Sequence, residues 1–554
     1  MLEAPTFNVP LGSEISGDDP LGLAPVNERL YGSVFPGINN VVRYIRVYGL
    51  LCWAAWRVER YLVGSRRTFT TRQVTELFTC MREKVELLIT WANVERHSGV
   101  PGLVGTRRKF PEADQRVTLR FEAFGSNEAA YMSAVQYRPS ITNGLGFMEA
   151  RAYDTFACTA AGVALAEAID AALHTSPHYA WLSKVDALST RRSQVLELRA
   201  MFDVEHPRRR EQDVFLTRFW PDTAEGEDIS LDANRRSGML LALRAVQAVN
   251  AWSEQQRRKS IGVSASDIRA AMARGCAPDG EPLSLNGVER AQAKWLVLQL
   301  RQYQRTCYEA FYVGLEYLLS GAVPIKDRSR TGVASLMGKF AEAAVEENEA
   351  PKVEDLEKEV RALQGREPSL YRAALREGEA DVFRRRARLL ETEPEVEDGS
   401  WMVVLGEAAM GLVYCAVEAE NLASDSRMRP YLGLDEDKKP LSRMPAWLAR
   451  FRARPVRELV AHIVLHDVID RHFDVVRNRS RGGDEKNRFR FIDADNGLRR
   501  YDEGRDVPRL GEAEDRLARA LDLLEQCSLL QRDESGYVLT MGGGRLLARY
   551  AALK

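Results

Sequence analysis

Apolar residues recur every three to four positions along most of the chain, which is the spacing of one face of an α-helix. The pattern predicts helices over residues 72–95 and from Val288 to Leu319. Residues 38–63 are apolar around most of a helical circumference, so this segment is expected to lie at the centre of a bundle. Ser264 is expected to open a further helix as its N-cap. The sequence therefore predicts a mainly α protein.

Alternation of apolar and charged residues, the pattern of a strand, is confined to short segments. Residues 488–492 alternate in this way, and Asn496 and Gly497 follow with the residue types that a tight turn needs. A helix from Pro455 to Asn478 is predicted just before this segment. Strands are therefore expected only in small hairpins.

A short motif occurs twice, 381 residues apart. The segments Phe156–Ala166 and Tyr537–Leu547 both read aromatic-x-x-Thr-x-x-Gly-x-x-Leu. Each follows an apolar helix end and a polar stretch, which is the order of the last helix, the β-hairpin wing and the Thr-capped closing helix of a winged helix. The motif predicts winged-helix-like units at residues 125–170 and 512–552. Winged helices bind nucleic acid or a partner protein, so the motif favours an interaction function.

The chain of 554 residues is longer than one hydrophobic core supports, so several domains are expected. The fold class predicted is mainly α, a multidomain helical protein with two winged-helix-like units and small β-hairpins. The regions predicted along the chain are an extended N-terminal arm at 1–30, a helical domain with the first winged-helix-like unit at 31–175, a helical bundle at 176–335, a charged helical arm or linker at 336–399, and a C-terminal helical domain with a β-hairpin and the second winged-helix-like unit at 400–554.

Charge and cysteine content exclude several classes of protein. The 78 basic and 79 acidic residues leave a net charge of −1, so any attraction to nucleic acid must be local. Seven scattered cysteines argue against a disulfide framework and a cysteine-rich zinc site, and they favour a reducing compartment. The N-terminus lacks a signal-peptide pattern, and the longest uncharged apolar run, Val47–Trp56, is too short to span a bilayer. We expect a cytoplasmic protein that does not contact membrane.

Nucleic-acid contacts are predicted on two groups of basic residues. The segment from Arg471 to Arg500 carries nine basic and five acidic residues on a helix end, a loop and a hairpin, which suits contact with a phosphate backbone. The C-terminal winged-helix-like unit adds arginines on its helices and beside its wing. DNA and other protein subunits are the expected partners, and no catalytic residue and no cofactor is predicted. The predicted nucleic-acid-binding residues are Arg477, Arg479, Arg481, Lys486, Arg488, Arg490, Arg516, Arg519, Arg532 and Arg545.

Two other functions remain open. The winged-helix-like units could contact protein only, which would make the chain an adaptor with residues 340–398 as its docking arm. Alternatively, His462, His466 and Asp470 lie at i, i+4 and i+8, a spacing that offers metal ligands to a hydrolase or nuclease. The other interpretation of these histidines is hydrogen bonding to the neighbouring hairpin and basic loop.

Two smaller patterns favour structural roles. Arg43 and Arg46 lie one turn apart on the predicted central helix, where an ion pair with a carboxylate elsewhere is the favoured use of a buried arginine. The glycine-rich loop at residues 99–105 precedes three basic residues, but its spacing is that of neither a P-loop nor a dinucleotide fingerprint. We expect a simple turn there.

The segment from Leu30 to Tyr48, a Pro-Gly turn followed by an Arg- and Tyr-rich helix, resembles the opening of a group of uncharacterised bacterial proteins. The later segment from His472 to Gly497 is similar to the same group. These helical, winged-helix proteins are encoded in mobile-element and anti-phage defence loci. The resemblance implies a DNA-linked accessory subunit of a genome-defence system, and it assigns no reaction to any residue.

Overall fold

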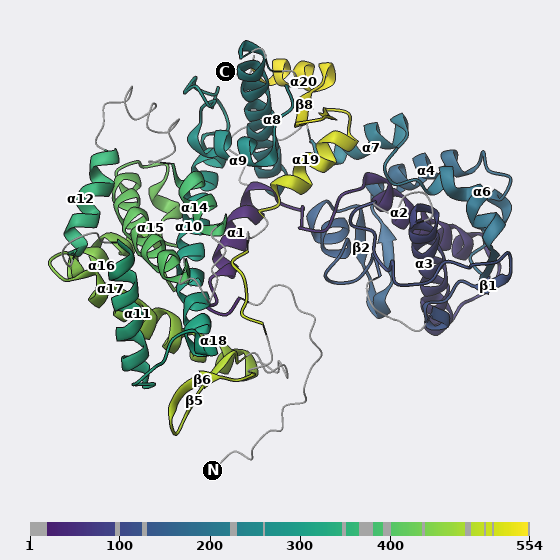
Figure 1. The fold of residues 1–554 in the computed structure, drawn as a ribbon. Helices are drawn as coiled ribbons and strands as arrows, with labels where there is room; N and C mark the ends of the chain where they lie inside the picture. Colours follow the sequence, from purple (N-terminus) through teal and green to yellow (C-terminus); the bar gives the residue numbers. More distant parts are fainter. Residues whose placement is uncertain are drawn as a thin grey trace. The chain divides into compact units, whose positions relative to one another are not determined.

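The computed structural model forms two compact units, each assembled from segments distant in the sequence (Figure 1). Unit 1 comprises Met1–Leu30, Pro278–Gly280 and Gln292–Ala513. Unit 2 comprises Tyr31–Ala277, Glu281–Ala291 and Glu514–Lys554, so the chain leaves unit 2 and later returns to it. The structure describes residues 19–94, 100–124, 130–221, 230–256, 258, 261–345, 351–364, 381–391, 400–434, 438–481, 489–502, 506–511 and 515–551.

The first part of unit 2 is built around helix α2, Ile45–Gly64. Every residue from Ile45 to Trp56 is buried, because helices α3, α4 and α7 all contact α2. This arrangement confirms the predicted central helix. The helix begins later than predicted because the Asn39 side chain accepts hydrogen bonds from the amides of Val41 and Val42, which fixes a local turn in place of helix.

The other elements of this part are short helices and antiparallel strand pairs. β1 pairs with β4, and β2 pairs with β3. Their bounds are α3 Thr71–Val94, β1 Arg116–Thr118, η1 Phe121–Phe124, η2 Ser140–Gly144, β2 Met148–Ala150, η3 Ala152–Asp154, β3 Phe156–Cys158, α4 Ala160–Leu173, α5 Tyr179–Leu182, β4 Ser189–Arg191, α6 Arg192–Phe202 and α7 Arg209–Phe219.

The second part of unit 2 joins two stretches that are far apart in sequence. Ser264 caps helix α9 by accepting the Asp267 amide, as predicted, and Gly275 ends that helix in the left-handed region at φ 65°. The amide and carbonyl of Val263 pair with those of Tyr537. The segment at Val263 thus forms an antiparallel bridge along the edge of the C-terminal hairpin. The elements are α8 Leu231–Gln255, α9 Ala265–Arg274, α19 Leu517–Gln526, β7 Leu530–Asp533, β8 Gly536–Leu539 and α20 Met541–Ala551.

Unit 1 is a helical bundle around α15, Ser400–Ala423. This helix contacts α11, α12, α14 and α16, and its Leu405, Ala408 and Leu412 are fully buried. Helices and 3-10 or π turns along this part of the chain and before it are α1 Ala24–Val34, α10 Glu289–Tyr317, η4 Leu318–Ala322, α11 Arg330–Val345, α12 Val353–Gln364, α14 Val382–Glu391, η5 Arg429–Tyr431, η6 Leu441–Arg443, α16 Met444–Phe451, α17 Val456–His462, η7 Ile463–Ile469 and α18 Asp470–Arg481.

Helix α15 also decides how the apolar content of the chain is interpreted. Among the described residues it is the one helix, over Trp401–Ala423, that is long and apolar enough to cross a membrane. Of that window, 72% is buried inside the fold. Its composition is thus accounted for by its central position among the helices of unit 1.

The predicted hairpin after α18 is confirmed. Strands β5, Phe491–Ala494, and β6, Gly497–Arg500, pair in antiparallel register across the Asn-Gly turn. Gly497 has φ 95°, and a Cβ atom there would lie 2.3 Å from the carbonyl oxygen of Arg328. Glycine is therefore required at this position both by its backbone conformation and by the close approach of another chain segment.

The predicted extended N-terminal arm and the predicted charged arm or linker are in part packed helices. Helix α1 begins at Ala24, inside the predicted extended arm, because Leu23, Val26 and Leu30 form a buried apolar stripe. In the predicted charged arm, Met337 and Ala341 of α11 are fully buried, and α11 contacts both α15 and α17. Only Arg330, Lys339 and Glu342 of α11 are charged, and its buried apolar positions share one face. Residues 1–18, 346–350, 365–380 and 392–399 of these regions lie outside the described residues.

Candidate nucleic-acid interface

The first copy of the repeated motif forms a closed hydrogen-bond network. The Thr159 hydroxyl accepts the amide of Gly162 at 3.3 Å, which N-caps helix α4. The same hydroxyl donates to the carbonyl of Gly146 at 2.8 Å, just before the hairpin, and the Thr159 amide donates to the carbonyl of Phe147 at 3.0 Å. A Cβ atom on Gly162 would lie 1.9 Å from that Phe147 carbonyl oxygen. The Thr and the Gly of the motif thus fasten the closing helix to the base of the hairpin.

The second copy repeats this network atom for atom. The Thr540 hydroxyl accepts the amide of Gly543 at 3.1 Å and donates to the carbonyl of Ser528 at 2.8 Å. The Thr540 amide donates to the carbonyl of Leu529 at 3.2 Å, and a Cβ atom on Gly543 would lie 2.4 Å from that oxygen. The residue before the hairpin is left-handed in both copies, with φ 65° at Gly146 and 60° at Ser528. The repeated sequence therefore encodes a repeated local structure.

The helices around the two hairpins also correspond. We define module 1 as α2, α3, the β2–β3 hairpin and α4, and module 2 as α8, α9, α19, the β7–β8 hairpin and α20. In each module the first helix contacts the second helix, the second hairpin strand and the closing helix. The two modules therefore share an order and a set of neighbours, although module 2 is interrupted by the segment that forms unit 1.

Helix α19 lies directly before the hairpin of module 2, and its single arginine is buried. Arg519 donates to the carbonyl of Asn40 at 2.9 Å and to the carboxylate of Asp522 at 2.8 Å. Asp522 also accepts from Tyr537 at 3.0 Å and forms an ion pair with Arg532. These charged groups are paired with one another inside unit 2. Helix α19 is therefore a packed, structural helix of this unit.

The other predicted arginines of module 2 differ in their surroundings. Arg532, with half of its side chain exposed, pairs with Glu525 at 2.8 Å as well as with Asp522. Arg516 adopts φ 66° and lies over the ring of Tyr31 at 5.0 Å. Arg545 is exposed on α20, and no ion pair involves it within the described part of the chain.

Module 1 has only a short helical turn before its hairpin. This turn contains η2 and one arginine, Arg138, which pairs with Asp154 at 2.9 Å and lies over the ring of Phe156 at 5.2 Å. In both modules, the arginine of the segment that precedes the hairpin is thus bound to a carboxylate of its own module.

In unit 1, Arg490 is part of a buried ion pair. It donates to both carboxylate oxygens of the fully buried Glu316, at 2.9 Å for the shorter contact, and Arg500 lies 3.9 Å from the same carboxylate. Arg477 is exposed on α18, 3.8 Å from Asp474 and 5.9 Å from the ring centre of Phe473. The predicted residues Lys486 and Arg488, and the side chains of Arg479 and Arg481, lie outside the described residues.

The histidine group is brought together by a π-helical segment, η7. His466 Nδ1 lies 3.1 Å from one carboxylate oxygen of Asp470, and Arg330 donates to the other at 3.0 Å. The rings of His462 and His466 are 4.7 Å apart, and burial lowers the pKa of His462. Asp470 therefore already engages a cation and a histidine. No group of three metal-ligating side chains occurs within the described ranges.

Buried charge marks the core of module 1. The predicted ion pair of Arg46 is confirmed: it donates to Glu211 at 2.8 Å, and both side chains are buried. On α3, burial raises the pKa of Glu86 to about 7, although Glu86 accepts the amide of Met132 at 3.0 Å. On the same helix, burial lowers the pKa of Lys84 to about 7, although its ammonium donates to two backbone carbonyls.

In the glycine-rich loop, Gly102 and Gly105 have positive φ, which agrees with the simple turn expected.

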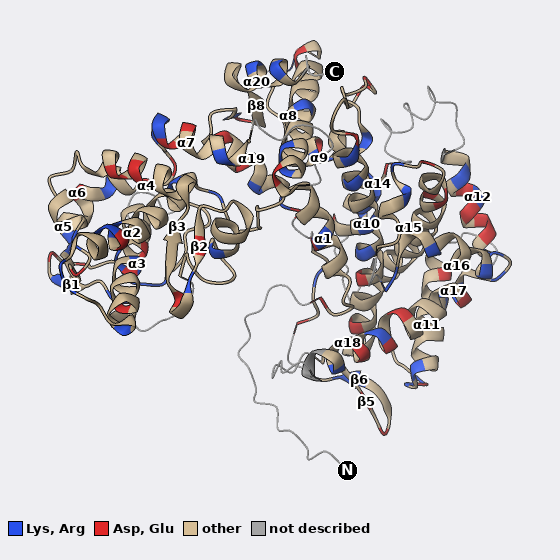
Figure 2. Cartoon of the chain, turned by 180° about the vertical axis from the view of Figure 1, so that it is seen from behind, with Lys and Arg blue, Asp and Glu red and all other residues tan. Residues whose placement is uncertain are grey.

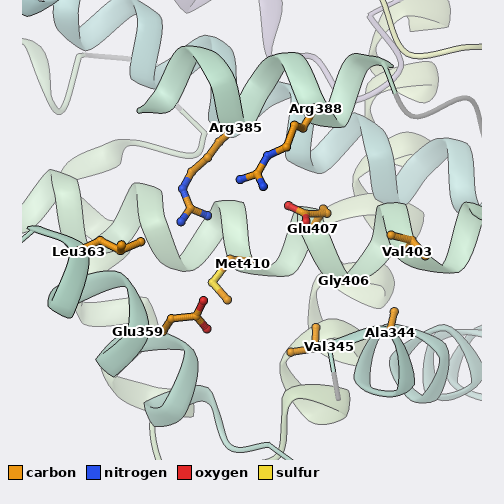
Figure 3. A pocket seen from close by; sticks show the side chains of 10 residues that line it. All are labelled: Ala344, Val345, Glu359, Leu363, Arg385, Arg388, Val403, Gly406, Glu407 and Met410. Carbon is orange, nitrogen blue, oxygen red and sulfur yellow. The ribbon is translucent and has the colours of Figure 1, made fainter. Parts of the chain in front are cut away.

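A pocket of about 350 Å³ lies in unit 1 between α11, α12, α14 and α15 (Figure 3). Arg385 and Arg388 project from α14 toward it, and Glu359 and Glu407 line it from the other helices. Two cations and two carboxylates balance, so the lining has no net charge that would select an ionic ligand.

Basic and acidic residues are interspersed along the helices of each unit (Figure 2). The segment that comprises the end of α2, the following turn and the start of α3 departs from this pattern and was not among the predicted sites. It carries a group of exposed arginines, and their spacing in the sequence signals neither a helix face nor a strand. The residues are Arg60, Arg66, Arg67 and Arg72.

Comparison with known proteins gives no assignment. No protein-family model, curated protein or solved structure matches this chain.

Proposed function

We propose that the two modules are winged helices and that the protein is a non-catalytic nucleic-acid-binding subunit that contacts phosphate groups rather than base edges. The observation that carries this proposal is the duplicated network of Thr159 and Thr540, which fastens a closing helix to the base of a β-hairpin in each module. A helix followed by a hairpin wing is the arrangement that presents phosphate-contacting side chains in winged-helix proteins.

The buried state of α19 is the reason for excluding base reading from the proposal. A recognition helix must offer exposed side chains to the major groove. Arg519 is held by Asn40 and Asp522, and the corresponding segment of module 1 has its arginine paired with Asp154. Contacts to phosphate carry no sequence information, so binding is expected to depend on ionic strength and little on sequence.

Fluorescence anisotropy over a salt series tests the proposal. The full chain is titrated into two duplexes of unrelated sequence and one single strand, at salt concentrations from 20 to 300 mM, chosen because the phosphate contribution falls steeply over that range. We expect affinity to fall linearly in log–log form as salt rises, with the two duplexes within a factor of about 3 of each other. Absence of binding at the lowest salt would contradict the proposal, and strong preference for one duplex would contradict the exclusion of base reading.

A protein-binding adaptor is the second candidate function. It is favoured by the contacts of α19, which docks on other parts of unit 2 through Arg519 to Asn40 and through Gln526 to the carbonyl of Glu205 at 3.0 Å. Module 2 thus already uses its helix for protein contact. Indifference to every nucleic acid in the salt series, together with a stoichiometric complex with a protein encoded beside it, would favour this function.

We further propose that the binding serves anti-phage defence, on the basis of the resemblance of Leu30–Tyr48 and His472–Gly497 to proteins of such loci. Phage plating on cells carrying the whole locus, with and without this chain, tests the assignment. Equal plating efficiency would contradict it.

A further inference from the structure

The end of α2, the turn after it and the start of α3 together concentrate positive charge. Residues 57–72 contain five arginines and one carboxylate, Glu59, a local balance of +4 in a chain whose net charge is −1. No lysine occurs in this segment, so its cations are all guanidinium groups, which match the geometry of phosphate oxygens. We call this segment, together with the neighbouring hairpin tip described below, the α2–α3 surface.

Four of the five arginines of this segment are exposed, and their charges are not neutralised by carboxylates. Arg60, Arg66, Arg67 and Arg72 are all exposed, and no ion pair involves any of them within the described residues. Arginines elsewhere in unit 2 show the contrast, since Arg46 is bound to a buried carboxylate. Like charges held close together without carboxylate partners repel one another. Binding of a polyanion would relieve this repulsion, and every arginine of the group would contribute to it.

An arginine of the module 1 hairpin pairs with the one carboxylate of the segment. Arg151, beside η3 at the hairpin tip, lies 3.7 Å from Glu59. The next residues of the tip, Tyr153 and Asp154, have φ 58° and 56°, and Tyr153 is 70% exposed. The hairpin tip and the C-terminal half of α2 therefore lie together, and the tip adds an aromatic ring to the basic surface.

Aromatic rings are interleaved with these arginines. The guanidinium of Arg60 lies 5.3 Å from the ring centre of Trp56. Tyr61, which is 41% exposed, lies 5.9 Å from the ring of Phe69. Exposed rings among arginines are the features with which proteins bind unpaired bases, because every base has a face that can stack.

We infer that the α2–α3 surface binds the phosphate backbone of nucleic acid, with Tyr61 and Tyr153 stacking on unpaired bases. The inference rests on the proposed nucleic-acid function and assigns its contact residues. An anionic membrane is the other polyanion that a basic surface fits. Nucleic acid is favoured because Val63, at 88% exposure, is the one aliphatic side chain that protrudes strongly here, whereas membrane contact depends on buried apolar area.

The test compares the wild-type chain with a variant carrying Arg60, Arg66, Arg67 and Arg72 changed to Gln. A matched control variant changes four other exposed arginines of unit 2, Arg116, Arg191, Arg209 and Arg210, to Gln, and so loses the same charge. We expect the surface variant to lose at least tenfold in affinity at low salt. For four lost phosphate contacts, its log–log salt slope should shrink by about 3.6 on a duplex and by about 2.8 on the single strand. The control variant is expected to change both quantities by less than half as much.

A second variant separates stacking from charge. Tyr61→Ala with Tyr153→Asn, chosen because Asn tolerates positive φ, should weaken binding to the single strand several-fold and leave duplex binding unchanged. Unchanged thermal unfolding of all variants shows that their folds are intact.

The outcomes distinguish the inference from the function on which it rests. If the wild type binds no nucleic acid, the proposed function fails and the inference fails with it. If the wild type binds and the surface variant behaves as the control variant does, the inference alone is overturned. The inference would also be overturned if the surface variant kept its DNA binding but lost the binding of the wild type to phosphatidylserine-containing vesicles. That result would identify a membrane contact.

Discussion

Modules 1 and 2 share a hydrogen-bond network but differ in how many of their exposed arginines have a carboxylate partner. In module 2, the carboxylate of Asp522 is surrounded by Arg519, Arg532 and Tyr537, so the charges are neutralised inside the unit. In module 1, Glu86 is buried without an ion pair in the described structure, and the arginines of the α2–α3 turn stand in solvent. The shared motif thus identifies a common local fold in the two modules, but it does not identify a common binding surface. The neighbours of each arginine, rather than the number of arginines, decide which module has charge available for a partner.

The largest effect should come from removing the centre of the module 2 network. Asp522→Ala leaves Arg519 buried without its carboxylate, and breaking a buried pair in this way costs about 3–5 kcal/mol of folding free energy. Chemical unfolding measures the loss. Asp213→Ala, which removes an exposed i,i+4 pair with Arg209, is the control and should cost below about 0.5 kcal/mol. Equal losses for the two variants would show that Asp522 does not organise module 2.

The buried carboxylate of module 1 should instead appear as a pH dependence. The folded pKa of Glu86 is raised to about 7 by burial, so its protonated form is favoured by folding. The stability this provides is complete below the unfolded pKa of about 4.3 and is lost as pH rises through 7, a change of roughly 4 kcal/mol. Glu86→Gln should remove that component and be more stable than the wild type at pH 8. Parallel stability curves for the two proteins between pH 5 and 8 would contradict this account.

The smallest effect tests whether both modules require glycine at the same position of the shared network. Gly543→Ala places a Cβ atom 2.4 Å from the Leu529 carbonyl oxygen and should cost about 1–3 kcal/mol. Its neighbour Gly544 has open space around the Cβ position, so Gly544→Ala should stabilise helix α20 by up to about 1 kcal/mol. Gly162→Ala, with a gap of 1.9 Å, should cost at least as much as Gly543→Ala. Thermal unfolding resolves these signs, and a stabilising Gly543→Ala would break the correspondence between the modules.

The sequence predicted the features that depend on neighbours along the chain. The Thr caps, the Ser264 helix start and the Asn496–Gly497 turn are local hydrogen-bond chemistry, and all three are confirmed. The apolar stripe of α11 was overlooked because a charge-dense stretch follows it directly in the sequence. Long-range pairing left no local signal: nothing in the sequence near Arg490 or Arg519 shows that Glu316 or Asn40 will bind them. The α2–α3 arginines were missed because their availability depends on which carboxylates lie nearby in space.

The interruption of module 2 has a consequence for the order in which the protein can fold during synthesis. Helices α8 and α9 leave the ribosome first, but α19, the β7–β8 hairpin and α20 follow only after the whole of the Gln292–Ala513 segment of unit 1 has been made. Until then, the part of α8 that packs on β8 and α20, and the paired edge at Val263, have no native partner. At a synthesis rate of roughly 5–20 residues per second, that interval lasts on the order of ten to forty seconds. Nascent chains of this protein are therefore expected to depend on chaperone protection of α8 over that interval, whereas module 1, whose parts lie within residues 45–173, can close beforehand.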